Sequence, residues 1–130
     1  MTTTLKSLAI IGGALLIAGA MVVLQTNNNS STASRENVLL EGNRQLVLIT
    51  AAGGYTPQIT EAQANTATTL RVKTIGSLDC ALAIAIPRIG YRKNLPLQGE
   101  TDIELGSYEK GDTLTGTCAM GMYSFQIRFL

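Results

Sequence analysis

The sequence contains no histidine. This absence excludes Ser-His-Asp and Cys-His catalysis, histidine-bearing zinc sites and the His₂Cys blue-copper site. The sequence also has only two cysteines and no tryptophan. Two cysteines are too few for a disulfide-dense scaffold, or for a Cys₄ zinc or iron–sulfur site within one chain. No acid–base pair or activated nucleophile can be identified among the remaining residues, so we predict that the protein is not an enzyme.

Charge is also sparse. Charged residues make up 15% of the 130 residues, and ten Lys and Arg against nine Asp and Glu give a net charge of +1. Because no run of like charges exists, the electrostatic footprint of a nucleic-acid-binding protein is missing. Apolar residues make up 45%, which is too many for a disordered chain. This length accommodates one compact domain and a tail or anchor.

The apolar excess is concentrated near the N-terminus. Residues 8–24 form an uncharged run, LAIIGGALLIAGAMVVL. As a helix this run would be roughly 25 Å long, near the lower limit for crossing a bilayer. The polar stretch TNNNSSTAS that follows it is typical of a flexible tether. We therefore predict a membrane anchor at 1–25, a tether at 26–36 and a folded domain at 37–130.

A cleaved signal peptide is the alternative for the same segment, because Ala18-Gly19-Ala20 has the small residues of a cleavage site. We favour an uncleaved anchor, since the apolar run continues to Leu24 without a polar region after these residues. Lys6 lies closer to the run than any basic residue on its other side, which favours an internal N-terminus and an external domain. The expected location is the cell membrane, with a single span and an extracytoplasmic domain.

The rest of the chain predicts a small all-β domain. Short apolar runs alternate with turn residues, and several show the period of two that is typical of half-buried strands. In residues 68–74, Leu70 and Val72 share one face, whereas Arg71 and Lys73 share the other. The expected strands are 37–40, 45–51, 55–60, with Pro57 at an edge or bend, 68–74, 81–86, 113–117 and 123–130. Residues 61–67 are expected to form at most one helical turn. This many short strands in a domain of about 95 residues predicts a β-sandwich or Greek-key barrel.

The sulfur-containing side chains of this domain are concentrated in two places. Cys118, Met120 and Met122 lie in the short run CAMGM, and Cys80 lies at the start of an expected strand. Thiolate and thioether sulfurs select soft ions, above all Cu(I). If the loops that carry these residues lie at the same end of the sandwich, the four sulfur atoms can form a Cu(I) site.

Simpler interpretations of the same residues remain open. Cys80 and Cys118 are also the natural pair for a structural disulfide in an extracytoplasmic β-sandwich. Met120 and Met122 are also typical of residues that fill gaps in a core. Asp79, next to Cys80, is interpreted as an ordinary turn residue, with tuning of the thiol or the metal as the alternative.

From Gly54 onward the chain resembles the cupredoxin-like domains of the EfeO-type family. The resemblance lies in Gly54-Tyr55-Thr56-Pro57, Thr69-Leu70-Arg71-Val72, Asp79-Cys80, Ile86-Pro87-Arg88-Ile89-Gly90, Thr101-Asp102-Ile103-Glu104-Leu105, Lys110-Gly111-Asp112 and, most specifically, Cys118-Ala119-Met120-Gly121-Met122-Tyr123. These motifs extend over roughly 80 of the about 95 domain residues. The resemblance implies a cupredoxin-like Greek-key β-sandwich or barrel after one transmembrane helix.

Within that family the chain is similar to the membrane-anchored Cu(I)-binding chaperones of CupA type. The resemblance implies that Cys80 and Cys118 form a tighter Cu(I) site, and that Met120 and Met122 form a weaker, more exposed one that shares Cys118. It implies one or two Cu(I) ions, no haem and no nucleotide. It also implies a copper-exporting P-type ATPase, or another copper-handling protein, as partner. Delivery to the cytosolic face of such an ATPase conflicts with an extracytoplasmic domain, so the orientation and the delivery step stay open.

Three functions therefore need to be distinguished. The preferred one is a membrane-anchored Cu(I)-binding protein that binds, buffers or transfers copper. The second is a structural β-sandwich with a Cys80–Cys118 disulfide and no metal. The third is an accessory subunit of a membrane transporter or oxidase that assembles through its anchor.

Overall fold

The computed structural model describes residues 33–130. The predicted transmembrane helix within 1–25 lies outside the described residues, as does most of the predicted tether. Within residues 33–130, no helix combines the length and the hydropathy that a membrane span requires. Ser34 forms a parallel bridge with Thr60, and Arg35 forms an ion pair with Glu61. The end of the predicted tether thus contacts the folded domain.

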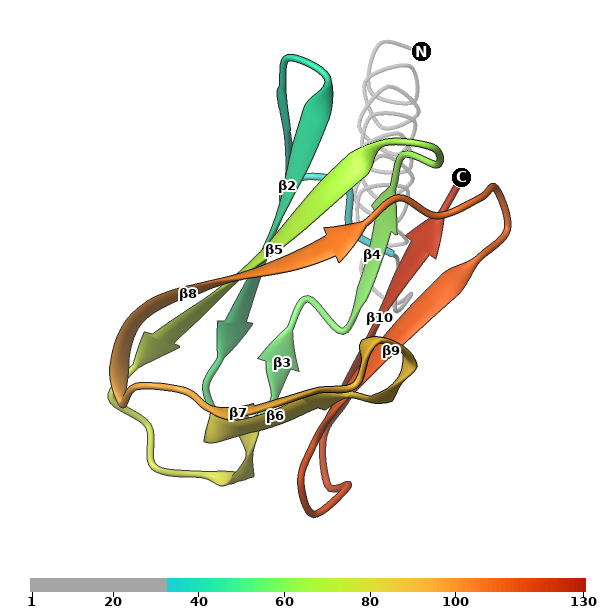
Figure 1. Cartoon of the computed structure of the whole chain (residues 1–130). Helices are drawn as coiled ribbons and strands as arrows, with labels where there is room; N and C mark the ends of the chain where they lie inside the picture. Colours follow the sequence, from blue (N-terminus) through green and yellow to red (C-terminus); the bar gives the residue numbers. More distant parts are fainter. Residues whose placement is uncertain (1–32) are drawn as a thin grey trace, which may run out of the picture. The chain divides into compact units, whose positions relative to one another are not determined.

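Ten β-strands in two five-stranded sheets dominate the described domain (Figure 1), which confirms the predicted all-β class. The first sheet contains β1 (Val38–Glu41), β2 (Arg44–Ala51), β5 (Ala67–Ile75) and β8 (Gln98–Gly106) in that order, and β3 (Tyr55–Thr56) pairs with β2. The second has the order β4 (Ile59–Ala62), β10 (Ser124–Phe129), β9 (Thr113–Cys118), β6 (Ala83–Ile86) and β7 (Tyr91–Asn94). Both sheets are mixed, because β2 pairs in parallel with β5 and β10 with β4.

One hydrophobic core joins the two sheets, the arrangement of a β-sandwich (Figure 1). Strand β5 shows how the sequence produces it, because its burial alternates with period two and places Leu70 and Val72 inside, as predicted. The other large side chains of the core come from both sheets and include Val47, Ile49, Ile84, Ile86, Ile103, Leu105, Leu114, Phe125, Ile127 and Phe129. Burial of one such side chain contributes about 1.5–3 kcal/mol.

Several predicted elements differ from those observed. The predicted strand 55–60 is two strands, β3 and β4, which lie in different sheets and are separated at Pro57. Residues 61–67 form no helical turn, because β4 continues to Ala62 and a turn with Asn65 in the left-handed region follows. The predicted strand 81–86 begins only at Ala83, since Cys80–Leu82 form the short 3-10 helix η1.

Strands β7 and β8 were not predicted from hydrophobic periodicity. The second 3-10 helix, η2 (Pro87–Ile89), leads into β7, in which three of the four residues are exposed. The first half of β8 is also exposed, and only Ile103 and Leu105 are buried. Strands with so few buried side chains lack the apolar alternation on which the prediction depends.

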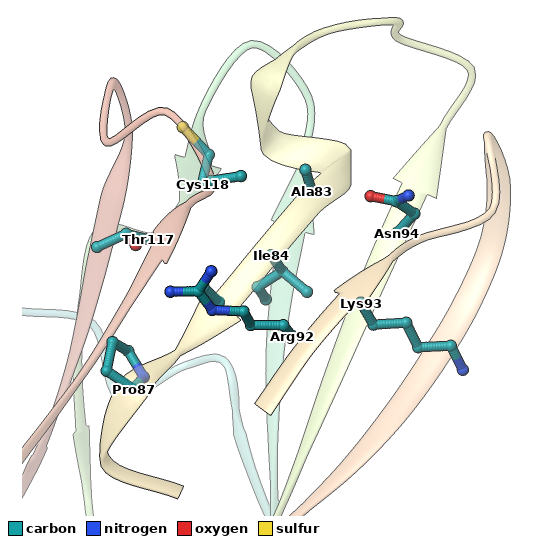
Figure 2. A pocket seen from close by; sticks show the side chains of 10 residues that line it. Ala83, Ile84, Pro87, Arg92, Lys93, Asn94, Thr117 and Cys118 are labelled. Carbon is teal, nitrogen blue, oxygen red and sulfur yellow. The ribbon is translucent and has the colours of Figure 1, made fainter. Parts of the chain in front are cut away.

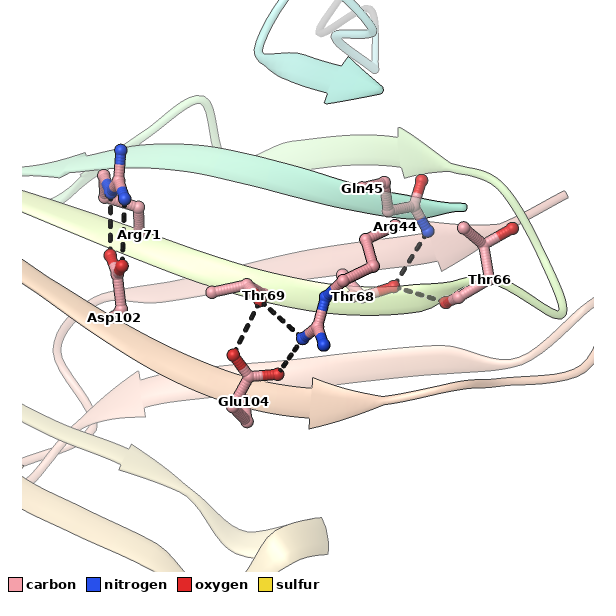
Figure 3. A network of polar contacts seen from close by, with 8 residues as sticks. All are labelled: Arg44, Gln45, Thr66, Thr68, Thr69, Arg71, Asp102 and Glu104. Carbon is pink, nitrogen blue, oxygen red and sulfur yellow. Dashed lines mark hydrogen bonds and ion pairs between the residues drawn. The ribbon is translucent and has the colours of Figure 1, made fainter. Parts of the chain in front are cut away.

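Ion pairs cover the outer face of the first sheet (Figure 3). The Arg71 guanidinium donates two hydrogen bonds to the Asp102 carboxylate, at 2.7 and 2.9 Å, across β5 and β8. These bonds hold the pKa of the Asp102 carboxyl below its usual range. Arg44 and Thr69 donate to Glu104 at 2.5 and 2.9 Å. Exposed pairs of this kind contribute little stability singly, but charged partners across strands favour the observed register.

A buried glutamine connects β2 to the turn after β4. Gln45 is 1% exposed, and its side-chain amide donates to the Gln63 carbonyl at 2.7 Å and to the Thr68 hydroxyl at 2.8 Å. Its side-chain oxygen accepts from the Gln63 N–H at 2.9 Å. A buried side-chain amide without hydrogen-bond partners would destabilise the fold. These three bonds satisfy both its donors and its acceptor, which explains why a glutamine is accommodated at position 45.

Candidate metal centre

Cys118 is the last residue of β9, and the loop after it is held by backbone hydrogen bonds. The Cys118 N–H donates to the Tyr123 carbonyl at 3.0 Å, and the Gly121 N–H donates to the Cys118 carbonyl at 2.9 Å. Gly121 has a φ of 72°, in the left-handed region that glycine adopts without strain. The Ala119 N–H donates to the Ala83 carbonyl of β6 at 2.7 Å. The loop is thereby fixed to both neighbouring strands.

The Asp79 carboxylate holds the loop that carries Cys80. It accepts hydrogen bonds from the Ser77 hydroxyl at 2.6 Å and from the Ala81 N–H at 2.8 Å, and so caps η1. It also accepts from the Gly53 N–H at 2.8 Å, which connects this loop to the turn between β2 and β3. These bonds, that of Ser77 most of all, hold the pKa of Asp79 below its usual range. Asp79 therefore has the structural role expected of a turn residue, and its bond to Gly53 additionally ties the loop that carries Cys80 to the turn between β2 and β3.

The two cysteines meet at one end of the sandwich, where η1 lies beside the end of β9. Their sulfur atoms form a disulfide between residues that are 38 positions apart in the sequence, with a Cα–Cα distance of 5.6 Å. Cys80 is half-buried, whereas Cys118 is 1% exposed. In the part of the chain that the structure describes, neither cysteine is free. The arrangement brings together the two residues that both the metal-site and the disulfide interpretations require.

The two methionines do not fill a gap in the core. Met120 and Met122 lie in the loop between β9 and β10, and they are 80% and 66% exposed. Exposed methionines in a loop next to a buried Cys118 leave their thioethers accessible to solvent and to soft ions. The core-filling interpretation of these methionines is therefore wrong.

Two tyrosines pack beside the cysteines at this end of the sandwich. Tyr55 is buried, its hydroxyl donates to the Ala81 carbonyl at 3.0 Å, and its ring meets the Phe125 ring edge-on at a centroid distance of 5.0 Å. Burial, together with the nearby Asp79 charge, raises the pKa of Tyr55 to about 12. The Tyr123 N–H donates to the Cys118 sulfur at 3.4 Å. This last donor belongs to the backbone, so no side-chain signal in the sequence could have identified it.

An open pocket of about 410 Å³ lies beside Cys118 on the second sheet (Figure 2). Small side chains of β6, Ala83 and Ala85, form part of its lining, and the Arg92 side chain extends over β6 toward Thr117 (Figure 2). The pocket adjoins the cysteine but presents no further sulfur ligand.

The donor set suits a soft ion once the disulfide is reduced. The thiolate, rather than the disulfide sulfur, is the form of cysteine that ligates metals. Two sulfurs close enough to bond are also close enough to share one ion after small side-chain rotations. Among residues 33–130, no group of three or more His, Cys, Asp or Glu side chains is placed to hold a metal. Zinc, which normally takes four such ligands, therefore finds no complete set in this part of the chain.

No family model matches the sequence. No curated protein matches it either. Among solved structures, the fold is similar to the metal-binding domain of CopA, the Cu(I)-exporting P-type ATPase of Streptococcus pneumoniae, crystallised with Cu(I). The TM-score is 0.67 at 19% identity, covering 78% of this chain and 99% of that domain.

A second similar structure is a copper-binding protein solved by NMR in the apo form. It has a TM-score of 0.67 and 19% identity, and the match covers 78% of this chain and all of the other. At this identity both matches show a shared fold. The neighbours are copper-binding domains, whereas the finer resemblance to the EfeO-type family stays a prediction.

Proposed function

We propose that this chain is a Cu(I)-binding protein that binds, buffers or transfers copper through Cys80 and Cys118, with Met120 and Met122 as further ligands. The observation that carries the proposal is the meeting of the two cysteines at one end of the sandwich, next to a loop with two exposed methionines. The fold that the chain shares with two copper-binding structures adds support.

The ligands divide into two sets with different affinities. In the reduced protein, Cys80 and Cys118 supply two thiolates, which bind the tighter Cu(I) ion. Met120 and Met122 supply thioethers, which are weaker ligands and bind a second ion together with Cys118. Their high exposure suits a site from which copper is readily passed to another protein.

The chain then acts as a carrier and not as an enzyme. Residues 1–25 anchor it in the cell membrane as a single span, with residues 26–36 as the tether. The domain at 37–130 lies on the extracytoplasmic side, where it collects or buffers copper. A copper-exporting P-type ATPase, or another copper-handling protein, is its partner.

One observation favours a second function. The Cys80–Cys118 disulfide is the feature expected of a structural β-sandwich that binds no metal. In that case the cysteines stabilise the fold, and the exposed methionines have no ligand role.

The two functions differ in a Cu(I) titration of the full 130-residue chain, reduced and kept anaerobic, against a competing Cu(I) chelator. The copper function predicts that the chain removes one or two ions from the chelator, and that Cys118→Ser abolishes binding of the tightest ion. Thr117→Ser, the neighbouring position, is the matched control and should leave binding unchanged. Replacing Met120 and Met122 together by Ala should remove only the weaker ion. A reduced chain that takes no copper from the chelator would support the structural function.

A further inference from the structure

We propose that the Cys80–Cys118 disulfide is a thiol–disulfide exchange site, at which a dithiol protein attacks Cys80, releases Cys118 and thereby opens the sulfur site to Cu(I). The consequence for copper rests on the proposed function, whereas the exchange chemistry stands without it. The proposal depends on how differently the structure surrounds the two sulfur atoms.

Access selects the sulfur that is attacked. In thiol–disulfide exchange, a thiolate attacks one sulfur of the bond and displaces the other, and the accessible sulfur reacts. Cys80 is half-buried and lies at the start of η1, in a connection between two strands. Cys118 is 1% exposed and ends a central strand of the second sheet. Because Cys80 is the more exposed residue of the pair, we expect an incoming thiolate to attack there.

The surroundings of Cys118 suit the departing sulfur. The Tyr123 N–H donates to the Cys118 sulfur at 3.4 Å, and this donor is held in place by the hydrogen bond from the Cys118 N–H to the Tyr123 carbonyl. A hydrogen bond to sulfur strengthens as negative charge develops there. Release of Cys118 as a thiolate is thereby favoured, and this thiolate is the one that both proposed copper sites share.

The surface around the bond favours a protein as the reductant. Leu78, two residues before Cys80, is 84% exposed, and Met120, two residues after Cys118, is 80% exposed. These two apolar side chains offer contact area to a protein partner, and methionine is enriched where proteins contact one another. The two loops that carry them also carry the disulfide, so a partner that contacts these side chains would lie close to Cys80.

The exchange balances in two steps. First, a partner thiolate attacks the Cys80 sulfur, the Cys80–Cys118 bond breaks, and a mixed disulfide forms between the partner and Cys80. Then the partner's second thiolate attacks its own sulfur in that mixed disulfide and releases Cys80. The partner's dithiol supplies two electrons and becomes a disulfide, and its two protons end on Cys80 and Cys118.

Trapping the mixed disulfide tests the order of attack. The full-length chain in its disulfide form is incubated with a thioredoxin-like protein whose second active-site cysteine is replaced by serine, so that the second step cannot occur. Free thiols are then alkylated, and the peptides are mapped by mass spectrometry. We expect the partner on Cys80 and the alkyl group on Cys118. A partner bound to Cys118, or no mixed disulfide in the folded chain, would overturn the proposal.

Single-cysteine variants provide a second test that does not need the partner. The Cys118→Ser variant retains Cys80 as its single cysteine, and the Cys80→Ser variant retains Cys118. In the folded chain, Cys80 should react with an aromatic disulfide reagent at least about tenfold faster than Cys118, because reactivity follows access. In guanidinium chloride the two rates should become equal, which controls for the chemistry of the thiols themselves. Equal rates in the folded chain would contradict the assignment.

Copper binding is measured separately, so that the two proposals can fail independently. After reduction by the intact thioredoxin-like protein, the chain should compete with the chelator for Cu(I), whereas the disulfide form, in which Cys118 is not free, should take no ion from it. If the adduct forms on Cys80 but the reduced chain takes no copper, the exchange site stands and the copper function fails. If a chemically reduced chain binds copper but no adduct forms, only the exchange site is overturned.

Discussion

Breaking the Cys80–Cys118 bond should lower the free energy of unfolding. The size of the loss depends on how many residues separate the two cysteines in the sequence. The bond closes a loop of 38 positions. In the chain-entropy description, a cross-link of this size restricts the unfolded chain and stabilises the fold by about 4 kcal/mol. Marginal domains have only about 5–15 kcal/mol of stability in total, so the loss should be large.

Urea denaturation of three forms of the full chain measures this effect: the disulfide form, the chain reduced with a dithiol, and the double variant Cys80→Ser with Cys118→Ser. The reduced chain and the double variant should unfold at similar, lower urea concentrations. In thermal unfolding the decrease in Tm should be about 20 °C for a domain of this size. Agreement between the two perturbed forms shows that the lost bond, and not serine, causes the change.

Cu(I) separates the reduced chain from the serine variant. A ligand that binds only the folded state at a hundredfold excess over its Kd restores about 2.7 kcal/mol. Added Cu(I) should therefore raise the stability of the reduced chain and leave the double variant unchanged. A reduced chain as stable as the disulfide form would refute the chain-entropy reasoning, and equal responses of both forms to Cu(I) would refute the cysteine site.

Three further predictions concern residues around the core and the site. Gly116→Ala should destabilise the fold by about 1–3 kcal/mol in urea denaturation, because the added Cβ would lie 2.1 Å from the Phe125 ring. Gln45→Ala should cost about 1–3 kcal/mol in the same assay, since it leaves the buried hydrogen-bonding groups around it without partners. The pKa of Asp79 is lowered in the folded state, so its contribution to stability is present above the ordinary carboxyl pKa and is lost as the pH falls through the lower folded value. Asp79→Asn should therefore flatten the acid side of the stability profile.

Each of these predictions has a matched control. Thr115→Ala adjoins Gly116 on the exposed face of β9 and should change stability little, so an equal loss in both variants would contradict the packing argument. Gln45→Glu keeps the shape of the side chain but not its donors, and a stable variant would show that the donors are unimportant. For Asp79→Asn the internal reference is Asp102, whose lowered pKa should still give the profile an acid slope, and a profile identical to that of the original chain would mean that Asp79 is not tuned by its neighbours.

The two cysteines were visible in the sequence, but their relation to one another was not. The sequence showed which residues carry sulfur and which chemistry they permit, but it left the pairing and the role of Cys80 and Cys118 open. The structure brings the two together because η1 and the end of β9 meet at the same end of the sandwich. It also places Met120 and Met122 in solvent, in agreement with the more exposed position that the family resemblance implies for them.

What the sequence determined by itself is local. The missing histidines exclude whole classes of site, and the alternation in residues 68–74 predicts a half-buried strand, because both depend only on residue types and near neighbours. Only the tertiary structure decided the exposed strands β7 and β8, the anchoring role of Asp79 and the meeting of Cys80 with Cys118. Each of these depends on contacts between distant segments, and such contacts follow from how two sheets pack on one core rather than from the order of neighbouring residues.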